Sequence, residues 1–221
     1  MALNLDQQIT PPTAPNLGSA DVAYDQGFFT QSFGGLNTYF SKLTALFSAL
    51  FGRRGGKWIN SPYGAFQDGT DQVAANTTTA YAITFDTTDF SNGVTLSNSS
   101  RLNVAQAGIY NLQFSIQFKN TTNDGQDVDV WFRKNGTNID NSNSRFHPPA
   151  RKSAGDPSHL IAALNFFVNL AANDYVEIMW QTTNVGVSIE HFAASSTPTR
   201  PAVPSVIATL SFVSNLSVET A

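Results

Sequence analysis

The chain has 221 residues, of which 41% are hydrophobic and 13% are charged, with a net charge of −4 and no cysteine. This length and hydrophobic content suffice for one substantial domain with extensions, although the charged share is about half of what is usual. The negative net charge leaves no basic surface for nucleic acid, and the absence of cysteine excludes disulfides and thiolate metal sites.

The sequence predicts neither a targeting segment nor a membrane segment. Its first residues lack a basic start followed by an apolar run, so we expect no signal peptide. No uninterrupted apolar stretch reaches the roughly 18 residues that a membrane span needs, so we expect no membrane partner. Asn, Thr, Ser and Gln supply most of the polar residues, and such a neutral surface suits packing against other protein.

Residues 1–34 predict an extended arm. They contain Pro11, Pro12 and Pro15, and no period of two or of 3.6 runs through them. A free tail usually has few large apolar residues, yet this segment contains Leu3, Leu5, Ile9, Leu17, Tyr24, Phe28 and Phe29. We expect the arm to anchor the chain on another protein and to become ordered there. The alternative is an arm that folds back on its own domain.

Residues 35–51 predict the one helix. Their apolar residues recur at spacings of three and four, and Gly52 suits the end of a helix. A heptad seam, which would gather three chains, is formed by Leu36, Phe40, Leu43, Phe47 and Leu50. About 16 residues, or roughly 24 Å, are too few for a coiled coil that stands alone. The alternative is a helix that packs on the sandwich of its own chain.

Residues 53–56, Arg-Arg-Gly-Gly, predict a hinge, so helix and hinge occupy 35–56 and the domain 57–221. The clearest strand is 108–118, where large apolar residues alternate with polar ones. Further period-two stretches cover 81–85, 102–104, 128–132, 160–170, 175–180, 187–192 and 206–212. With Asn135-Gly136 as a hairpin signal, this pattern predicts an all-β antiparallel sandwich.

The apolar content of the long strands exceeds what one sandwich can bury. Both the 108–118 strand and the stretch 161–168 are rich in large apolar residues. We therefore expect a second buried surface between subunits, with Tyr110, Phe114 and Phe167 in it.

The segment Gly108-x-Tyr110, followed by Leu112 and Phe114, resembles a strand of the trimeric jelly rolls of tumour necrosis factor and the complement globular heads. Residues 172–178 are similar to that family's Gly-Asp-x-Val turn, with Asn173 in place of the glycine, whereas 205–214 lacks its Phe-x-Gly-Phe ending. The resemblance implies a trimeric jelly roll. Its inner sheet, around a three-fold axis, would contain about Tyr63–Gln67, Tyr110–Phe118, Leu160–Leu170 and Val206–Val213.

Residues 35–215 also look like virion structural proteins of marine tailed phages. The similar segments are Pro62–Asp68, Trp131–Gly136 and Pro204–Phe212. This resemblance implies a non-enzymatic virion component on the capsid or tail surface: a decoration protein, a head fibre or a fibre tip.

Residues suited to catalysis or metal binding form no convincing pattern. Histidine occurs at three positions without ligand spacing: His147, His159 and His191. Asp124, Asp127 and Asp129 lack the spacing of a calcium loop and predict a solvated turn. Glu177 with Glu190, on neighbouring strands, is the one conceivable carboxylate pair. We expect no enzyme activity, no cofactor and no metal.

The favoured hypothesis is a homotrimeric capsid decoration, cement or head-fibre protein whose arm binds the major capsid protein. The alternative is a receptor-binding tail-fibre or tail-tip module, whose arm would enter a tail adaptor and whose loops 138–158 would bind host cell-surface glycan. A third hypothesis, a polysaccharide-degrading enzyme, depends only on the carboxylate pair. Among the candidate sugar platforms Trp58, Trp131 and Trp180, we expect Trp180 in the core.

Overall fold

A computed structural model of the chain describes residues 26–51 and 61–214. The chain divides into two compact units, Met1–Asn60 and Ser61–Ala221, and each unit is described by itself. Within α1, the side chains described are those of residues 33–47. The predicted arm residues Leu3, Leu5, Ile9, Leu17 and Tyr24 lie outside the described residues.

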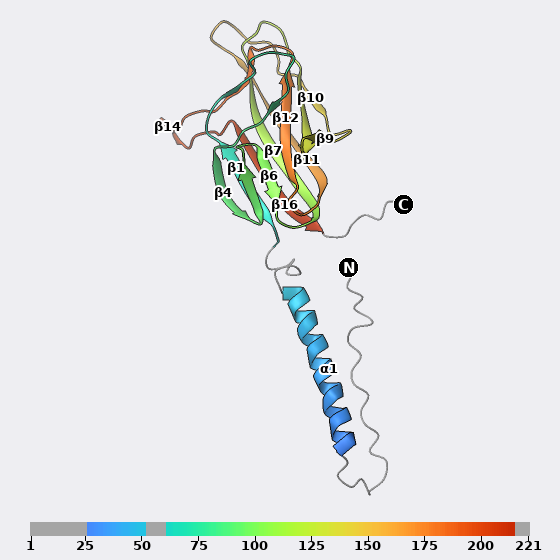
Figure 1. Cartoon of the computed structure of the whole chain (residues 1–221). Helices are drawn as coiled ribbons and strands as arrows, with labels where there is room; N and C mark the ends of the chain where they lie inside the picture. Colours follow the sequence, from blue (N-terminus) through green and yellow to red (C-terminus); the bar gives the residue numbers. More distant parts are fainter. Residues whose placement is uncertain (1–25, 52–60, 215–221) are drawn as a thin grey trace. The chain divides into compact units, whose positions relative to one another are not determined.

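The first unit contains one helix, α1 (Gln26–Phe51), which has 26 residues (Figure 1). It begins well before residue 35, so residues 26–34 of the predicted arm, including Phe28 and Phe29, are helical instead. The sequence interpretation stopped at Gly34 and Gly35, because glycine costs about 1 kcal/mol inside a helix. No helix among the described residues has the length and apolarity needed to cross a membrane.

The second unit is an all-β antiparallel sandwich, as predicted. The β7 sheet has seven strands, which are β1 (Tyr63–Asp68), β2 (Gln72–Val73), β4 (Thr87–Asn92), β7 (Gly108–Asn120), β11 (Ser158–Leu170), β13 (Val187–Ile189) and β16 (Val206–Ser214). The β12 sheet also has seven, which are β3 (Tyr81–Ala82), β5 (Val94–Ser97), β6 (Arg101–Val104), β8 (Val128–Lys134), β9 (Thr137–Asn138), β10 (Ser144–Phe146) and β12 (Tyr175–Thr182). All named strand pairs are antiparallel.

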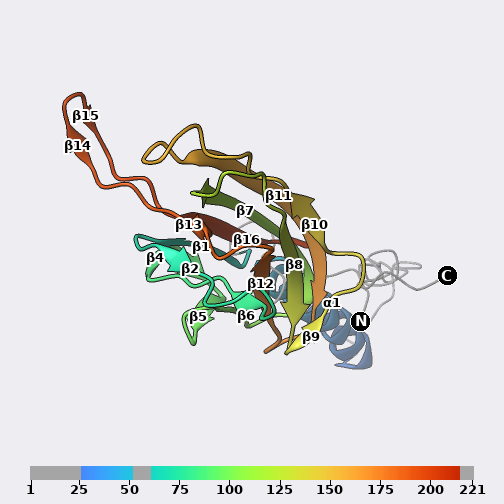
Figure 2. The same cartoon turned by 90° about the horizontal axis from the view of Figure 1, so that it is seen from above.

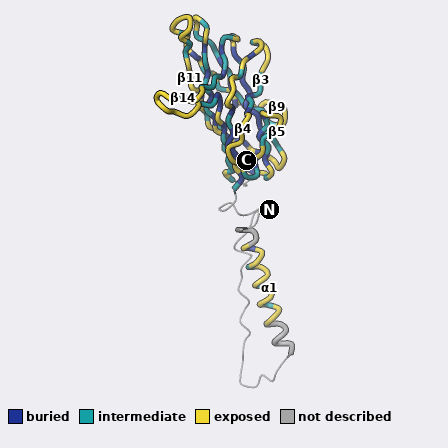
Figure 3. The backbone as a smooth tube through the Cα atoms, turned by 90° about the vertical axis from the view of Figure 1, so that its left-hand side faces the viewer, coloured by how far each residue is buried: buried dark blue, intermediate teal, exposed yellow. Residues whose placement is uncertain are grey.

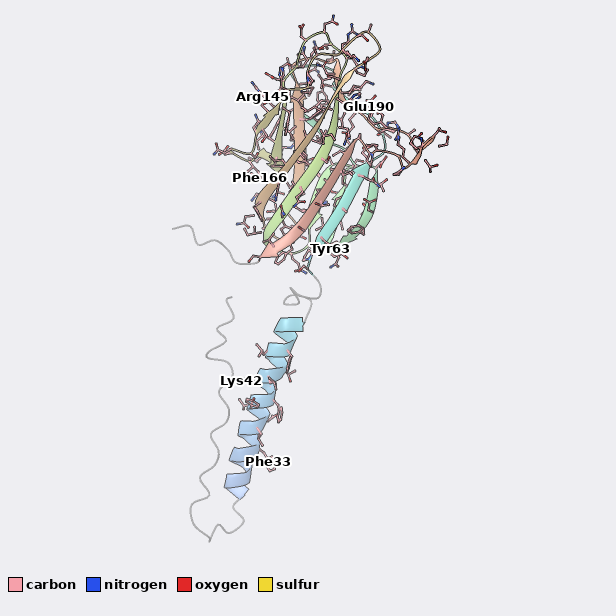
Figure 4. All side chains as sticks on the ribbon, turned by 180° about the vertical axis from the view of Figure 1, so that it is seen from behind. Phe33, Lys42, Tyr63, Arg145, Phe166 and Glu190 are labelled. Carbon is pink, nitrogen blue, oxygen red and sulfur yellow. The ribbon has the colours of Figure 1, made fainter. Side chains whose placement is uncertain are left out.

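The four strands expected in one inner sheet do share a sheet. β7 pairs with β11 along one edge, and its other edge pairs with β16, which in turn pairs with β1. The order across this sheet is therefore β11-β7-β16-β1-β4, and Figure 4 looks onto it. The β12 sheet has the order β10-β8-β12-β6-β5.

The core lies between the two sheets and follows from the alternation of β7. Its even-numbered side chains are buried from residue 110 to 118, and Figure 3 shows buried backbone concentrated in the sandwich. From the β12 sheet, Phe132 and Trp180 enter the same core, as was predicted for Trp180. Their rings pack against β7, with Phe132 6.0 Å from Phe114 and Trp180 6.2 Å from Phe118 between ring centroids.

At two positions, 136 and 108, the structure explains why the residue is glycine. The Asn135-Gly136 hairpin between β8 and β9 is confirmed, and both residues have positive φ, as this tight turn requires. Gly108 is the buried first residue of β7, where the predicted strand 108–118 also begins. A Cβ atom there would lie 2.4 Å from Cε2 of Phe212. Gly108 is thus required by packing against β16.

The predicted loop regions contain short strands. β10 lies inside the predicted loop 138–158 and pairs with β8. A separate hairpin of β14 (Ser195–Ser196) and β15 (Thr199–Arg200) extends away from the body of the sandwich (Figure 2).

Candidate self-association surfaces

The first candidate surface is the heptad seam of α1. Leu36, Phe40 and Phe47 are exposed, with Phe40 at 59%, and Leu43 is partly exposed. Leu50 belongs to α1, but its side chain lies outside the described residues. Since α1 begins at Gln26, Phe29 and Phe33 continue the seam N-terminally with the same steps of four and three. The seam therefore covers more than the segment predicted.

α1 carries very little charge. Lys42 is its only charged residue, and its first turn has no acidic and its last turn no basic residue. Lys42 and Phe33 are labelled in Figure 4. In heptad positions, residue 42 falls away from the seam. The seam thus presents an uncharged row of large apolar side chains.

The second candidate surface is the outer side of the β7 sheet. It is formed by outward side chains of β7, β11 and β16, and we call it the neutral face; its members are Asn111, Gln113, Ser115, Gln117, Ile161, Ala163, Asn165, Phe167, Ile207, Thr209 and Ser211. None of these residues is charged. Ile161 and Phe167 are 62% and 58% exposed.

Strand register arranges the neutral face in rows. Phe167 and Ser211 flank Asn111, and one row further Asn165 and Thr209 flank Gln113. Five of the six side chains in these two rows are amides or hydroxyls, which can both donate and accept hydrogen bonds. Oδ1 of Asn111 is buried and forms no hydrogen bond within the described chain.

An exposed aromatic pair extends this side of the sheet. Tyr63 on β1 and Phe90 on β4 contact edge to face, with ring centroids 5.9 Å apart. Both are exposed, and Ala65, which pairs with Phe90, has the same orientation as Tyr63.

Two of the predicted interface residues are wrong. Tyr110 and Phe114 are buried in the core of their own sandwich, whereas Phe167 faces outward. The Tyr110 ring packs 5.5 Å from that of Phe212, its hydroxyl donates to the carbonyl oxygen of Gln106, and burial raises its pKa to about 12. The reason is parity: Phe167 pairs with Asn111, and successive residues of a strand point to opposite sides. One side of the sheet can therefore present either Phe167 with Asn111 or Tyr110 with Phe114, but not both pairs.

A charged cluster borders the neutral face at one end. Glu190, 14% exposed, forms an ion pair with Lys119, and its Oε2 lies 2.8 Å from Nε2 of His159. Figure 4 labels Glu190 near the opposite end of the sheet from Tyr63. The negative charge of the Glu190 carboxylate is therefore balanced by Lys119 within the chain.

The second glutamate lies in a different sheet. Glu177 on β12 is only 3% exposed and accepts hydrogen bonds from Arg133 and Ser100, each at 2.9 Å. Nε of Arg101 lies 3.5 Å from Oε1, an ion-pair distance rather than a good hydrogen bond. Because β12 belongs to one sheet and Glu190 follows β13 in the other, the proposed carboxylate pair on neighbouring strands is wrong.

The remaining histidines and aspartates form separate pairs. Nδ1 of His147 lies 2.8 Å from Asp127, and Nδ1 of His191 lies 2.7 Å from Asp71. Burial raises the pKa of Asp71, but hydrogen bonds from His191 outweigh it and hold this pKa below its ordinary value. Asp124 accepts a hydrogen bond from Asn120 through its backbone carbonyl. The described residues contain no group of three metal-ligating side chains.

The sequence interpretation missed the amide rows and the apolar residues Ile161 and Ile207. For Ile161 the signal was present in the alternation of β11, where the even-numbered residues from 160 to 170 share one side and the odd-numbered Ile161 and Phe167 share the other. Tracing both sides of each strand would have separated Phe167 from Tyr110.

Comparison with known proteins adds no relative to this picture. No protein-family model matches the chain, and no curated protein sequence matches it either.

Proposed function

We propose that this protein is a non-enzymatic virion structural protein of a bacteriophage, a homotrimeric capsid decoration, cement or head-fibre protein. The observation that carries the proposal is the pair of uncharged, exposed surfaces, the α1 seam and the neutral face, on one chain. Large apolar side chains such as Phe40 and Phe167 gain free energy when another surface covers them. A second copy of the same chain has the same low charge and the same surfaces.

The sandwich is proposed to be a jelly roll. The sheet order β11-β7-β16-β1-β4 supports this, since first, last, central and late strands lie together as the resemblance to tumour necrosis factor implies. The three-fold axis is likewise taken from that resemblance. In such a trimer the neutral face of each copy packs against its neighbours.

The outer side of the β7 sheet is large enough to contribute to this role. With strands about 4.8 Å apart and a rise of about 3.3 Å per residue, the outer side of β11, β7, β16, β1 and β4 covers roughly 700 Å². A stable pairwise interface buries about 800 Å² per partner. The α1 seam offers additional area for contacts between copies.

The chemistry of the neutral face favours contacts with itself. Amide and hydroxyl side chains such as Gln113 and Thr209 can pair with the same groups of a second copy. Burying them costs less than burying charges, because no ion has to be desolvated. Lys119 and Glu190 are already paired within the chain at the edge.

The proposed anchor is the N-terminal arm, which would bind the major capsid protein. Residues 1–25 remain the candidate segment, because Phe28 and Phe29 belong to α1. The test is deletion of residues 1–25, assayed by cosedimentation with capsids and by mass in solution. The proposal expects lost attachment and an unchanged trimer, and a truncated protein that still decorates capsids would contradict it.

A receptor-binding tail-fibre or tail-tip module is the second candidate. A pocket beside Trp131 on the other sheet favours it, since an aromatic ring among amides suits sugar. Electron microscopy of virions labelled with antibody against this chain distinguishes the two, because label on the head supports decoration and label on the tail supports receptor binding.

A further inference from the structure

A pocket of about 320 Å³ opens on the outer side of the β12 sheet, which is the other sheet from the one that carries the neutral face. Its lining residues come from β8, β9, β12 and the loop before β10. Six of its lining residues carry the inference: Asp129, Trp131, Asn138, Asp140, Asn141 and Gln181. Its volume is at the lower end of the range for small-molecule sites, roughly 300–1,000 Å³.

Hydrogen bonds within the protein hold the walls of this pocket in place. Nε1 of Trp131 donates to Oδ1 of Asn138 at 2.9 Å, which fixes the indole on the β8–β9 hairpin. Nε2 of Gln181 donates to the backbone carbonyl of Thr77 at 2.7 Å. Asn138 itself is held by the Asn135-Gly136 turn, which sets the register of β9 against β8. A site held in this way needs little ordering when a ligand binds.

Asp129 is fixed by a bidentate ion pair. Nε and Nη2 of Arg145 donate to its two oxygens at 3.0 and 2.9 Å, and Asn143 donates at 3.3 Å. The Arg145 hydrogen bonds hold the pKa of Asp129 below its ordinary value. Asp129 therefore stays ionised, and its charge is balanced by Arg145.

Several polar groups at the pocket are left for a ligand. The side chains of Asp140 and Asn141 form no hydrogen bond or ion pair with other described residues, and Nδ2 of Asn138 and Oε1 of Gln181 are likewise uncommitted there. The set includes amide donors, amide acceptors and one carboxylate. The indole N–H is already used, so Trp131 offers its ring as an apolar surface.

We infer that this pocket binds a neutral saccharide unit. A sugar ring has an apolar side of C–H groups, which can lie on the indole of Trp131, and hydroxyls that both donate and accept, which match amides and a carboxylate. Charge argues against an anionic ligand, because Asp140 has no cationic partner among the described residues. The inference does not depend on whether the protein sits on the head or the tail.

The test presents the full-length chain to an array of neutral, sialylated and sulfated glycans and titrates those that bind by calorimetry. We expect neutral glycans to bind and anionic ones to be rejected. Trp131→Ala should weaken binding at least about tenfold, as loss of the aromatic contact predicts. Val185→Ala, which removes exposed apolar atoms from the loop between β12 and β13, outside both the pocket lining and the neutral face, is the control and should bind as the wild type does.

A further variant guards against a folding defect in Trp131→Ala. Asp140→Ala leaves the indole and its hydrogen bond to Asn138 in place, and it should weaken binding of the same glycan without lowering the melting temperature, because the Asp140 side chain forms no hydrogen bond or ion pair with other described residues. Binding of no neutral glycan, equal binding by wild type and the pocket variants, or preference for sialylated or sulfated glycans would each overturn the inference.

Discussion

Substitution of Phe167 by serine tests the neutral face directly. Phe167 is 58% exposed, so of the roughly 200 Å² of a phenylalanine side chain about 115 Å² remains to be covered. At about 25 cal/mol per Å², full coverage contributes about 3 kcal/mol per copy. A loss of that size corresponds to more than a hundredfold in association per copy.

The assay is sedimentation velocity of the full-length chain over a range from nanomolar to micromolar. We expect wild type to sediment as a trimer and Phe167→Ser to dissociate at higher concentration. The control is Val185→Ser, which removes an exposed apolar side chain from the loop between β12 and β13, outside the neutral face. Val185→Ser should associate as wild type does.

Two results would refute the reasoning about this surface. One is a wild-type chain that is monomeric at micromolar concentration. The other is a Phe167→Ser chain with unchanged association, because Phe167 would then lie outside any contact between copies. In the second case the α1 seam could still hold the oligomer, and Phe40→Ser would show whether it does.

Three further predictions concern stability, each measured on the full-length chain. Asn120→Ala should destabilise the sandwich by about 2–4 kcal/mol in urea unfolding, because buried Asn120 donates to the carbonyls of Asp124, Pro148 and Pro149; exposed Asn169→Ala should change it little. Gly108→Ala should cost about 1–3 kcal/mol in the same assay, since the new Cβ would also lie 2.7 Å from the carbonyl of Ser214. Arg145→Ala should lower the melting temperature near neutral pH, because Arg145 lowers the pKa of Asp129 in the folded state. This interaction stabilises the fold at pH values above the ordinary Asp pKa of 3.8, and the stabilisation is lost as the pH falls through the pKa of Asp129 in the folded state. That difference should vanish in acid, whereas Lys152→Ala, in an exposed pair with Asp156, should have no such pH profile.

The long strands were predictable because burial on one side leaves a period of two, whereas β4, whose residues are almost all exposed, was not predicted. The segment Gly108–Phe118 has this pattern without a break, and the structure extends it only to Asn120. Strand pairing was not predictable from the pattern alone, since the partners of β7 are β11 and β16, which are distant in sequence. Only the resemblance to a known family placed those strands in one sheet.

The helix boundary failed for a local reason and the interface residues for a geometric one. Gly34-Gly35 reads as a break by propensity, yet α1 continues through it, and the seam residues on both sides share one heptad register. For the interface, the aromatic residues of β7 were interpreted as more than the core could bury, although Tyr110 and Phe114 lie on its core-facing side. Tyr110 is in the core, and outward-facing Asn111 is its neighbour in the chain.

The presence of two modest surfaces on one chain has an energetic consequence. A seam of little more than three heptads is marginal as an isolated coiled coil, and a sheet side rich in amides such as Gln113 and Asn165 gains less from burial than an apolar one. Because both belong to the same polypeptide, association through one makes association through the other intramolecular, at an effective concentration near millimolar for a short tether. Each surface can therefore be weaker than a free-standing interface. Low charge on both surfaces removes the repulsion that would otherwise oppose bringing identical copies together.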